Sequence, residues 1–208
     1  LKVIGNIAFD YVVDPAEAGI AFTGGMQFST GVDIIKPWAC GDTLTDSRDN
    51  KTYATILIGT QCWMAENLNV GTKLFVASYP QGTNCDTASA IQKYCQADSD
   101  ANCTTYGGLY EWNQAMCGST TAGAKGICPT GWHIPTHDEI TTLERAVCTS
   151  GTCATDFPFD ASTEGDRGTD EGTKLKAGGS SGFNNLLGGS SYNGHFASLE
   201  WMGYFWSS

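Results

Sequence analysis

Oxygen-bearing side chains alternate along Asp98-Ser-Asp100-Ala-Asn102. This is the ligand spacing in the first half of a calcium-binding loop. The stretch lacks the glycine that such loops carry at the sixth place, where Cys103 stands, and it lacks the glutamate at the twelfth. Two interpretations stay open: a calcium site formed by these three side chains, with Ca²⁺ as the cofactor, or a polar turn closed by a Cys95–Cys103 disulfide.

The three histidines give weaker signals. His133 and His137 are four residues apart, a spacing that can bind zinc on one face of a helix. Pro135 lies between them, so the two rings need not share a face, and packing or surface roles are the alternative. His195 stands alone in a glycine-rich stretch, and no Gly-x-Ser-x-Gly elbow accompanies it. Glu66, beside Trp63, is either a buried acid or a carboxylate that orders loops by hydrogen bonds.

Nine cysteines point to disulfides and an oxidising, extracellular setting, because no Cys-x-x-Cys pair of a zinc site is present. Short loops are the easiest to close, although spacing alone leaves the connectivity open. On that ground we expect four bridges and leave Cys85 unpaired. The expected pairs are Cys40 with Cys62, Cys95 with Cys103, Cys117 with Cys128, and Cys148 with Cys153.

The composition excludes some partners. The chain has 208 residues, 41% of them hydrophobic, 26 glycines and a formal net charge of −11. An acidic balance argues against nucleic acid, whose phosphates require Lys and Arg. No run of about eighteen apolar residues could span a membrane. We expect a loop-rich globular protein with no nucleic-acid partner and no membrane span.

The secondary-structure signals are local. Alternation predicts a strand over 53–58, a two-residue turn at Gly59-Thr60, and a return strand through Cys62-Trp63-Met64. Thr136 with Glu139 forms a capping box, which predicts a helix with Ile140, Leu143 and Val147 on its apolar face. Further expectations are short helices over 86–95 and 109–116, a loop over 178–194, and an aromatic strand over 201–208.

Residues 1–39 have a different texture, without cysteine and with few charges. Their β-type runs predict either an extension of the same domain's sheet or an arm that pairs with the open sheet edge of another subunit. The arm interpretation makes this segment a subunit contact. Its apolar contact residues would be Val3, Ile4, Ile7, Phe9, Tyr11 and Val13.

Five groups of residues occur in an order that resembles a known family. They are Asp46-Ser-Arg-Asp49 with Ile58-Gly-Thr-Gln-Cys-Trp-Met-Ala-Glu-Asn-Leu-Asn69, Tyr106-Gly-Gly-Leu-Tyr110, Cys128-Pro-Thr-Gly-Trp-His-Ile-Pro-Thr136, Gly172-Thr-Lys-Leu-Lys176 and Gly203-Tyr-Phe-Trp-Ser-Ser208. From about residue 40 to residue 208 the chain is identified as a member of the Fibrobacter succinogenes major paralogous domain family.

The resemblance implies a bacterial secreted or surface-attached module. Residues 131–136 are also similar to a motif of formylglycine-generating enzymes, which implies an α+β, C-type-lectin-like fold. That fold is irregular and loop-rich, with short helices, antiparallel strands, disulfide staples and here an N-terminal β extension. Catalysis of that kind would need a reactive cysteine pair late in the chain. No cysteine follows Cys153, so we do not expect an enzyme.

Family members usually continue past Trp206-Ser-Ser with further strands and a last cysteine, which this sequence lacks. We therefore expect either a fragment or a domain, 40–208, whose gap another subunit fills with the arm of 1–39. The leading functional expectation is a non-enzymatic extracellular structural or adhesive protein, a subunit of a bacterial surface filament or pilus that self-associates into a homopolymer by strand exchange. The alternative is a lectin-type module that binds surface glycans, with calcium as a possible aid.

Overall fold

The computed structural model describes residues 38–78, 80–162 and 164–208. These ranges form a mixed α/β structure of short helices and four two-stranded sheets. The strands are β1 (Leu44–Thr45), β2 (Thr52–Tyr53), β3 (Thr55–Ile58), β4 (Gln61–Met64), β5 (Thr72–Leu74), β6 (Gln92–Tyr94), β7 (Gly188–Tyr192) and β8 (His195–Leu199). The helices are α1 (Asp100–Tyr106), α2 (Trp112–Ala115), α3 (His137–Val147), α4 (Cys153–Asp156) and α5 (Glu171–Leu175), with single 3-10 turns η1 (Val76–Ser78) and η2 (Gln96–Asp98).

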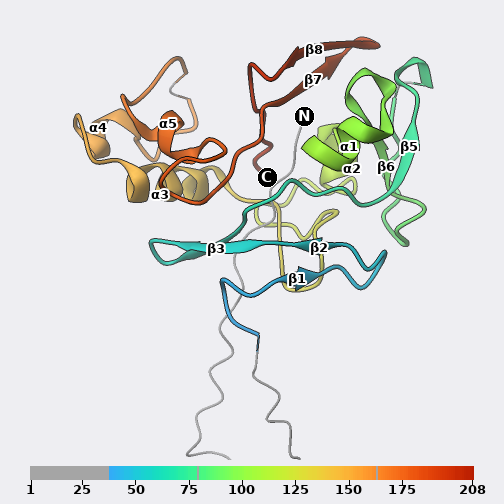
Figure 1. Cartoon of the computed structure of the whole chain (residues 1–208), viewed down its shortest axis with the longest axis horizontal. Coiled ribbons are helices and arrows are strands. Elements are labelled where there is room, and N and C mark those ends of the chain that lie inside the picture. The colour runs from blue at the N-terminus through green and yellow to red at the C-terminus, as the bar shows by residue number, and fades with distance from the viewer. Residues whose placement is uncertain (1–37, 79, 163) are drawn as a thin grey trace, which may run out of the picture.

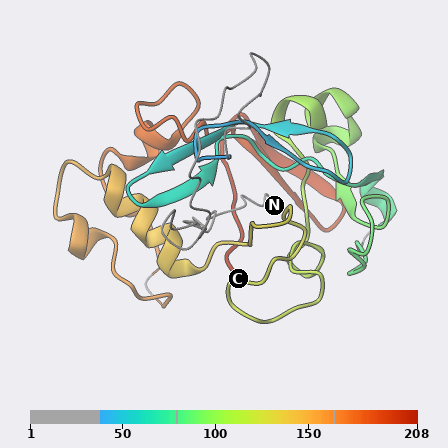
Figure 2. The same ribbon diagram turned by 90° about the horizontal axis from the view of Figure 1, so that it is seen from below.

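The helices gather at two ends of the molecule. Helices α3, α4 and α5 lie at one end, whereas α1, α2, β5 and β6 lie at the other (Figure 1). The β7–β8 hairpin runs along the side opposite β1, β2 and β3 (Figure 1), and the view from below shows the cyan strands β3 and β4 between the two helical ends (Figure 2). Within the described ranges no helix has the length and apolar character needed to cross a bilayer.

The β3–β4 hairpin confirms the sequence prediction and forms the centre of the core. Gly59 has φ +60°, as the first position of a type II′ turn requires, and Ile56 pairs with Trp63. All four residues of β4 are buried, and Trp63 and Met64 are 1% and 0% exposed. Residues 38–55 share this core, since Tyr53 is buried in it and Cys40 is bonded to Cys62.

Helix α3 also forms as predicted. The Thr136 hydroxyl accepts from the Glu139 amide while the Glu139 carboxylate accepts from the Thr136 amide at 2.8 Å, which completes the capping box. Leu143 and Val147 are buried and Ile140 packs partly against the core. Local capping and tertiary burial therefore favour the same helix.

Of two other helix predictions, one is wrong and one is confirmed only in part. Residues 86–95 form a turn followed by β6, which pairs in parallel with β5, because Ile91 at 0% exposure anchors an extended chain beside Gly71. The predicted helix over 109–116 shrinks to the single turn α2, since Leu109 forms a bridge with Tyr94 instead. In both places tertiary pairing outweighs a weak helical periodicity.

Near the end of the chain, a strand forms where a loop was predicted, and the predicted final strand does not form. The expected loop over 178–194 contains β7, which pairs with β8. Asn193-Gly194 forms the turn between the two strands. Both turn residues have positive φ, 48° and 77°, as a type I′ turn requires. The expected strand over 201–208 does not form: Phe205 makes a single bridge, and Trp206 anchors the segment while Trp201 is exposed.

The end of the described chain is anchored by side chains. The Trp206 indole N–H donates to Tyr110 O at 2.9 Å, and the Trp112 indole N–H donates to Ser207 O at 3.1 Å. The Ser208 amide donates to Pro135 O at 2.9 Å. Indole donors thus replace the backbone ladder that a strand would need.

The disulfide prediction needs one correction. Cys40–Cys62, Cys95–Cys103 and Cys148–Cys153 are present as expected, but the fourth bridge joins Cys85 to Cys117. Cys128, expected to pair with Cys117, is a buried free thiol packed in the core, and Cys85, expected to be unpaired, is bonded. By loop-closure scaling the longer loop, with a separation of 32, costs only about 1 kcal/mol more than the 117–128 loop. Packing therefore decides the pairing.

The expected N-terminal arm, with its contact residues Val3, Ile4, Ile7, Phe9, Tyr11 and Val13, lies outside the described residues. The pairing of this arm remains a prediction.

Candidate functional site

Two open clefts mark the described surface. The tryptophan cleft, about 490 Å³, is lined by residues that include Arg167, Glu171, Lys176, Asn185, Trp201 and Tyr204. The lysine–asparagine cleft, about 420 Å³, is lined by residues that include Asn50, Lys51, Glu66, Asn67, Asn69 and Thr104. The two share no lining residue.

Trp201 is the most exposed large hydrophobic residue of the described chain, at 79%. A turn after β8 turns it outward: the amides of Trp201 and Met202 both donate to Ser198 O at 3.1 Å. Ser198 and Glu200 have φ of 60° and 62°, the left-handed region that non-glycine residues adopt only at some cost. The backbone is thus bent to leave an indole face free beside a cleft.

The wall behind Trp201 holds polar atoms with unmet hydrogen-bonding capacity. Glu171, at the start of α5, is 4% exposed, and its Oε2 accepts from the amides of Thr169 and Asp170 at 2.8 and 3.1 Å. Its Oε1, Asn185 Oδ1 and Arg167 Nη1 are buried with no partner among the described residues. Buried polar groups normally have partners, so these three atoms require an explanation.

One ion pair and one largely buried carboxylate lie near this cleft. Lys174 bonds Asp170 at 2.8 Å, and this contact lowers the pKa of the Asp170 carboxyl to about 2. Burial raises the pKa of Glu144 on α3, which the charge of Arg167 partly offsets. Among the residues that line the cleft itself, Arg167 and Lys176 are cationic and Glu171 is acidic, beside the aromatic face of Trp201.

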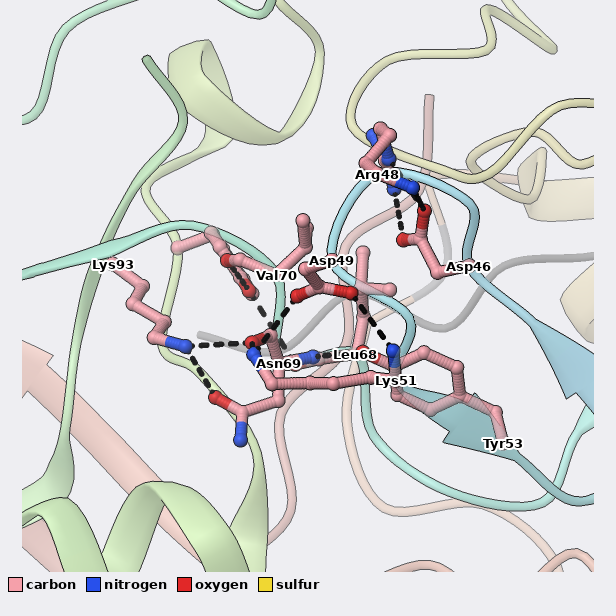
Figure 3. A network of polar contacts seen from close by, with 10 residues as sticks. Asp46, Arg48, Asp49, Lys51, Tyr53, Leu68, Asn69, Val70 and Lys93 are labelled. Atoms are coloured by element: carbon pink, nitrogen blue, oxygen red, sulfur yellow. Dashed lines mark hydrogen bonds and ion pairs between the residues drawn. The ribbon is translucent and has the colours of Figure 1, made fainter. Parts of the chain in front are cut away.

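The lysine–asparagine cleft borders an irregular segment, Leu68–Val70, whose backbone is held by side chains (Figure 3). Tyr110 OH donates to Val70 O at 2.6 Å, and the Asn69 amide donates to Tyr53 OH at 3.1 Å. Asn69 O accepts from Lys51 Nζ at 2.5 Å and from Lys93 Nζ at 2.6 Å. These donors satisfy carbonyls that would otherwise be buried without partners.

Lys93 is the unusual member of this network. It is 6% exposed, and no described carboxylate forms an ion pair with it. Burial, followed by the charge of Lys51, lowers the pKa of Lys93 to about 8. Lys51 differs, because Asp49 lies 2.9 Å from its Nζ.

The side chains proposed for calcium have other partners. Asp98 Oδ1 accepts from the Val76 amide at 3.0 Å, and Asp100 forms an ion pair with Lys73 at 2.7 Å. The Asn102 amide nitrogen donates to Gln96 O at 2.8 Å. Across 38–78, 80–162 and 164–208 no three His, Cys, Asp or Glu side chains gather as a metal site. The Cys95–Cys103 disulfide closes the turn as the second interpretation expects, and the calcium site remains a prediction.

The other sequence candidates are dispersed. His133 Nε2 lies 3.0 Å from Glu139, whereas His137 Nε2 lies 3.4 Å from the Thr141 hydroxyl, so the two rings face different partners. Glu66 Oε2 accepts from the Ala54 amide at 2.8 Å and orders two loops, as the second interpretation predicts. The thiol of Cys128 is fully buried, which raises its pKa to about 12 and disfavours the thiolate.

Sequence reasoning missed Trp201, which it placed in an aromatic strand. The turn that exposes Trp201 depends on left-handed backbone at Ser198 and Glu200, and neither residue type signals that conformation. It also missed the lysine–asparagine cleft, since Lys51, Asn69 and Lys93 lie in separate segments.

The family-level comparison agrees with the motifs. The model described as the Fibrobacter succinogenes major domain matches residues 56–208, so the chain belongs to this family. No curated protein and no solved structure matches the chain.

Proposed function

We propose that this protein is a non-enzymatic extracellular adhesive module that binds a glycan in the tryptophan cleft. The observation that carries the proposal is the exposed indole of Trp201, at 79%, beside a wall that contains the unpartnered atoms of Glu171 and Asn185.

Sugars suit this combination of groups. The C–H face of a pyranose ring is apolar and stacks on an aromatic side chain, while each hydroxyl both donates and accepts. Trp201 supplies the platform, Glu171 and Asn185 supply acceptors, and Arg167 and Lys176 supply donors. A ligand hydroxyl that reaches these buried atoms would give them the partners they lack.

The setting supports a surface role. Four disulfides hold the described chain, a density typical of proteins in oxidising compartments. The short helices, small sheets and long loops are consistent with the C-type-lectin-like fold that the family motifs imply, and we adopt that fold as part of the proposal.

A glycan array followed by calorimetry tests the proposal. Trp201→Ala should raise Kd about tenfold or more, since burying an indole against a sugar contributes about 1.5–3 kcal/mol. Tyr192→Ala is the matched control, because Tyr192 is 77% exposed and lines neither cleft. A blank array, or equal losses in both variants, would contradict the proposal.

A second candidate is the subunit of a surface filament assembled by strand exchange. It is supported by the sheets, since each described sheet has two strands and therefore leaves a strand edge for another chain to pair with. Electron microscopy of native material tests it: filaments that dissociate when residues 1–13 are deleted support exchange, and particles of a single monomer contradict it.

A further inference from the structure

We propose that the lysine–asparagine cleft is a second binding site, which takes the carboxylate of a small ligand. This inference is independent of the glycan proposal, because the two clefts have no residue in common.

The orientation of Asn69 is the first argument. Lys93 Nζ lies 2.6 Å from Asn69 Oδ1, and an ammonium can only donate. Oδ1 must therefore face Lys93, which turns the NH₂ group of Asn69 away from it (Figure 3). No described residue accepts from this NH₂ group, and Asn69 lines the cleft. The cleft thus has a donor whose orientation a lysine fixes.

Two further donors complete the site. Asn67 lines the cleft, is 6% exposed, and has a buried Nδ2 without a partner among the described residues. Lys51 Nζ donates to Asp49 and to Asn69 O, which leaves one of its three N–H bonds for a ligand. Amide and ammonium groups that line one cleft and keep N–H bonds without an acceptor among the described residues suit an anion.

The charge of Lys93 behind the wall is a further argument, because the carboxylates of Asp49 and Asp100 act on it only from beyond ion-pair distance. The ammonium groups of Lys51 and Lys93 both bond to Asn69 O, and Lys93 forms no ion pair with a described carboxylate. Buried charges usually have a counter-charge. A bound anion would supply it from the cleft side.

The charges also limit what can bind. Glu66 is the only carboxylate that lines the cleft, and one of its oxygens is taken by the Ala54 amide. Its charge, with a net charge of −11 on the chain, disfavours polyanions. A single carboxylate is therefore the chemistry that fits, and either an acidic sugar or the C-terminus of a peptide can supply it.

Calorimetry on the full chain tests the site with glucuronate and N-acetylglycine as probes and glucose as the uncharged control. We expect at least one carboxylate to bind and glucose not to bind in this cleft. The probe that binds identifies the source of the carboxylate. Lys51→Met should weaken binding about tenfold, the value of one charge-assisted hydrogen bond, while Lys125→Met, an exposed lysine that lines neither cleft, should have no effect.

Glu66→Gln separates a binding effect from a folding effect. Removing the only lining carboxylate should tighten binding of the carboxylate probe severalfold, a gain that misfolding cannot produce. If neither carboxylate binds the unmodified chain, or if Glu66→Gln weakens binding, the proposal is overturned. Glycan binding in the tryptophan cleft would survive that result.

Discussion

The two clefts differ in the chemical groups that they present. The tryptophan cleft presents a free aromatic face with donors and acceptors of both charge signs, which suits a neutral, hydroxyl-rich ligand. The lysine–asparagine cleft presents oriented N–H donors before a buried ammonium, which suits an anion. The chemical difference between the clefts arises from the residues that form their walls. The wall of the tryptophan cleft contains buried polar atoms without partners, whereas a lysine network around Leu68–Val70 lies behind the lysine–asparagine cleft.

The largest expected effect comes from the disulfide that lies at only one cleft. Cys103 lines the lysine–asparagine cleft and bonds Cys95, eight residues away. Replacing both by alanine should lower the free energy of unfolding by about 2–3 kcal/mol and weaken carboxylate binding more than glycan binding. Urea unfolding and calorimetry measure the two effects.

The control for that variant is the Cys148→Ala, Cys153→Ala pair, whose bridge lines neither cleft. It should leave both binding activities intact. Equal losses of both ligands in the Cys95 and Cys103 variant would mean that the clefts are not separate units.

A glycine pair tests the tryptophan cleft. A Cβ on Gly203 would stand 2.5 Å from Asn185 Oδ1, so Gly203→Ala should displace Asn185, lower the free energy of unfolding by about 1–3 kcal/mol, and weaken glycan binding. Gly172 lines the same cleft within α5 and has open space around it. Gly172→Ala should therefore stabilise the protein by up to about 1 kcal/mol. Thermal unfolding that ranks the two variants in the reverse order would refute this account of the wall.

The pH dependence of stability tests the lysine network. The pKa of Lys93 is about 8 in the folded chain, against about 10.4 for an unperturbed lysine. Between these values the unfolded chain binds more protons, so the free energy of unfolding should rise with pH from about 8. The raised pKa of the buried Cys128 thiol, about 12, opposes this rise above about pH 9, and the raised pKa values of Tyr53 and Tyr110 oppose it above about pH 10. Urea unfolding should therefore be compared with Lys93→Met: the stability of the unmodified chain relative to this variant should rise between about pH 8 and pH 10.

The smallest expected effect is that of calcium. Asp98, Asp100 and Asn102 are engaged by Val76, Lys73 and Gln96, so a chelator should not change the melting temperature or the binding in either cleft. A loss of glycan binding on chelation, restored by Ca²⁺, would instead revive the calcium site of the sequence prediction.

The sequence predicted those parts of the fold that local chemistry specifies. The Thr136–Glu139 capping box and the Gly59 turn each satisfy backbone groups with nearby atoms, and both formed as expected. Asn193-Gly194 is an equally strong local signal for a hairpin turn, although the sequence analysis predicted a loop over 178–194. The family motifs were likewise sufficient to recognise the family.

The sites were harder to predict because they depend on distant contacts. The pairing of Cys85 with Cys117 and the burial of Cys128 follow from packing, which loop length does not report. Lys93 meets Asn69 across a separation of 24 residues, and Trp201 faces outward because of a strained turn. Neither the Lys93–Asn69 contact nor the turn that exposes Trp201 produces a periodic pattern in the sequence.

One crossed measurement tests the central claim that the clefts are separate and chemically different. The ligand found by the glycan array and the bound carboxylate probe are titrated into Trp201→Ala and Lys51→Met. We predict that Trp201→Ala loses only the glycan and that Lys51→Met loses only the carboxylate. If one variant loses both ligands while its fold is intact, the two clefts act as a single site and the account is wrong.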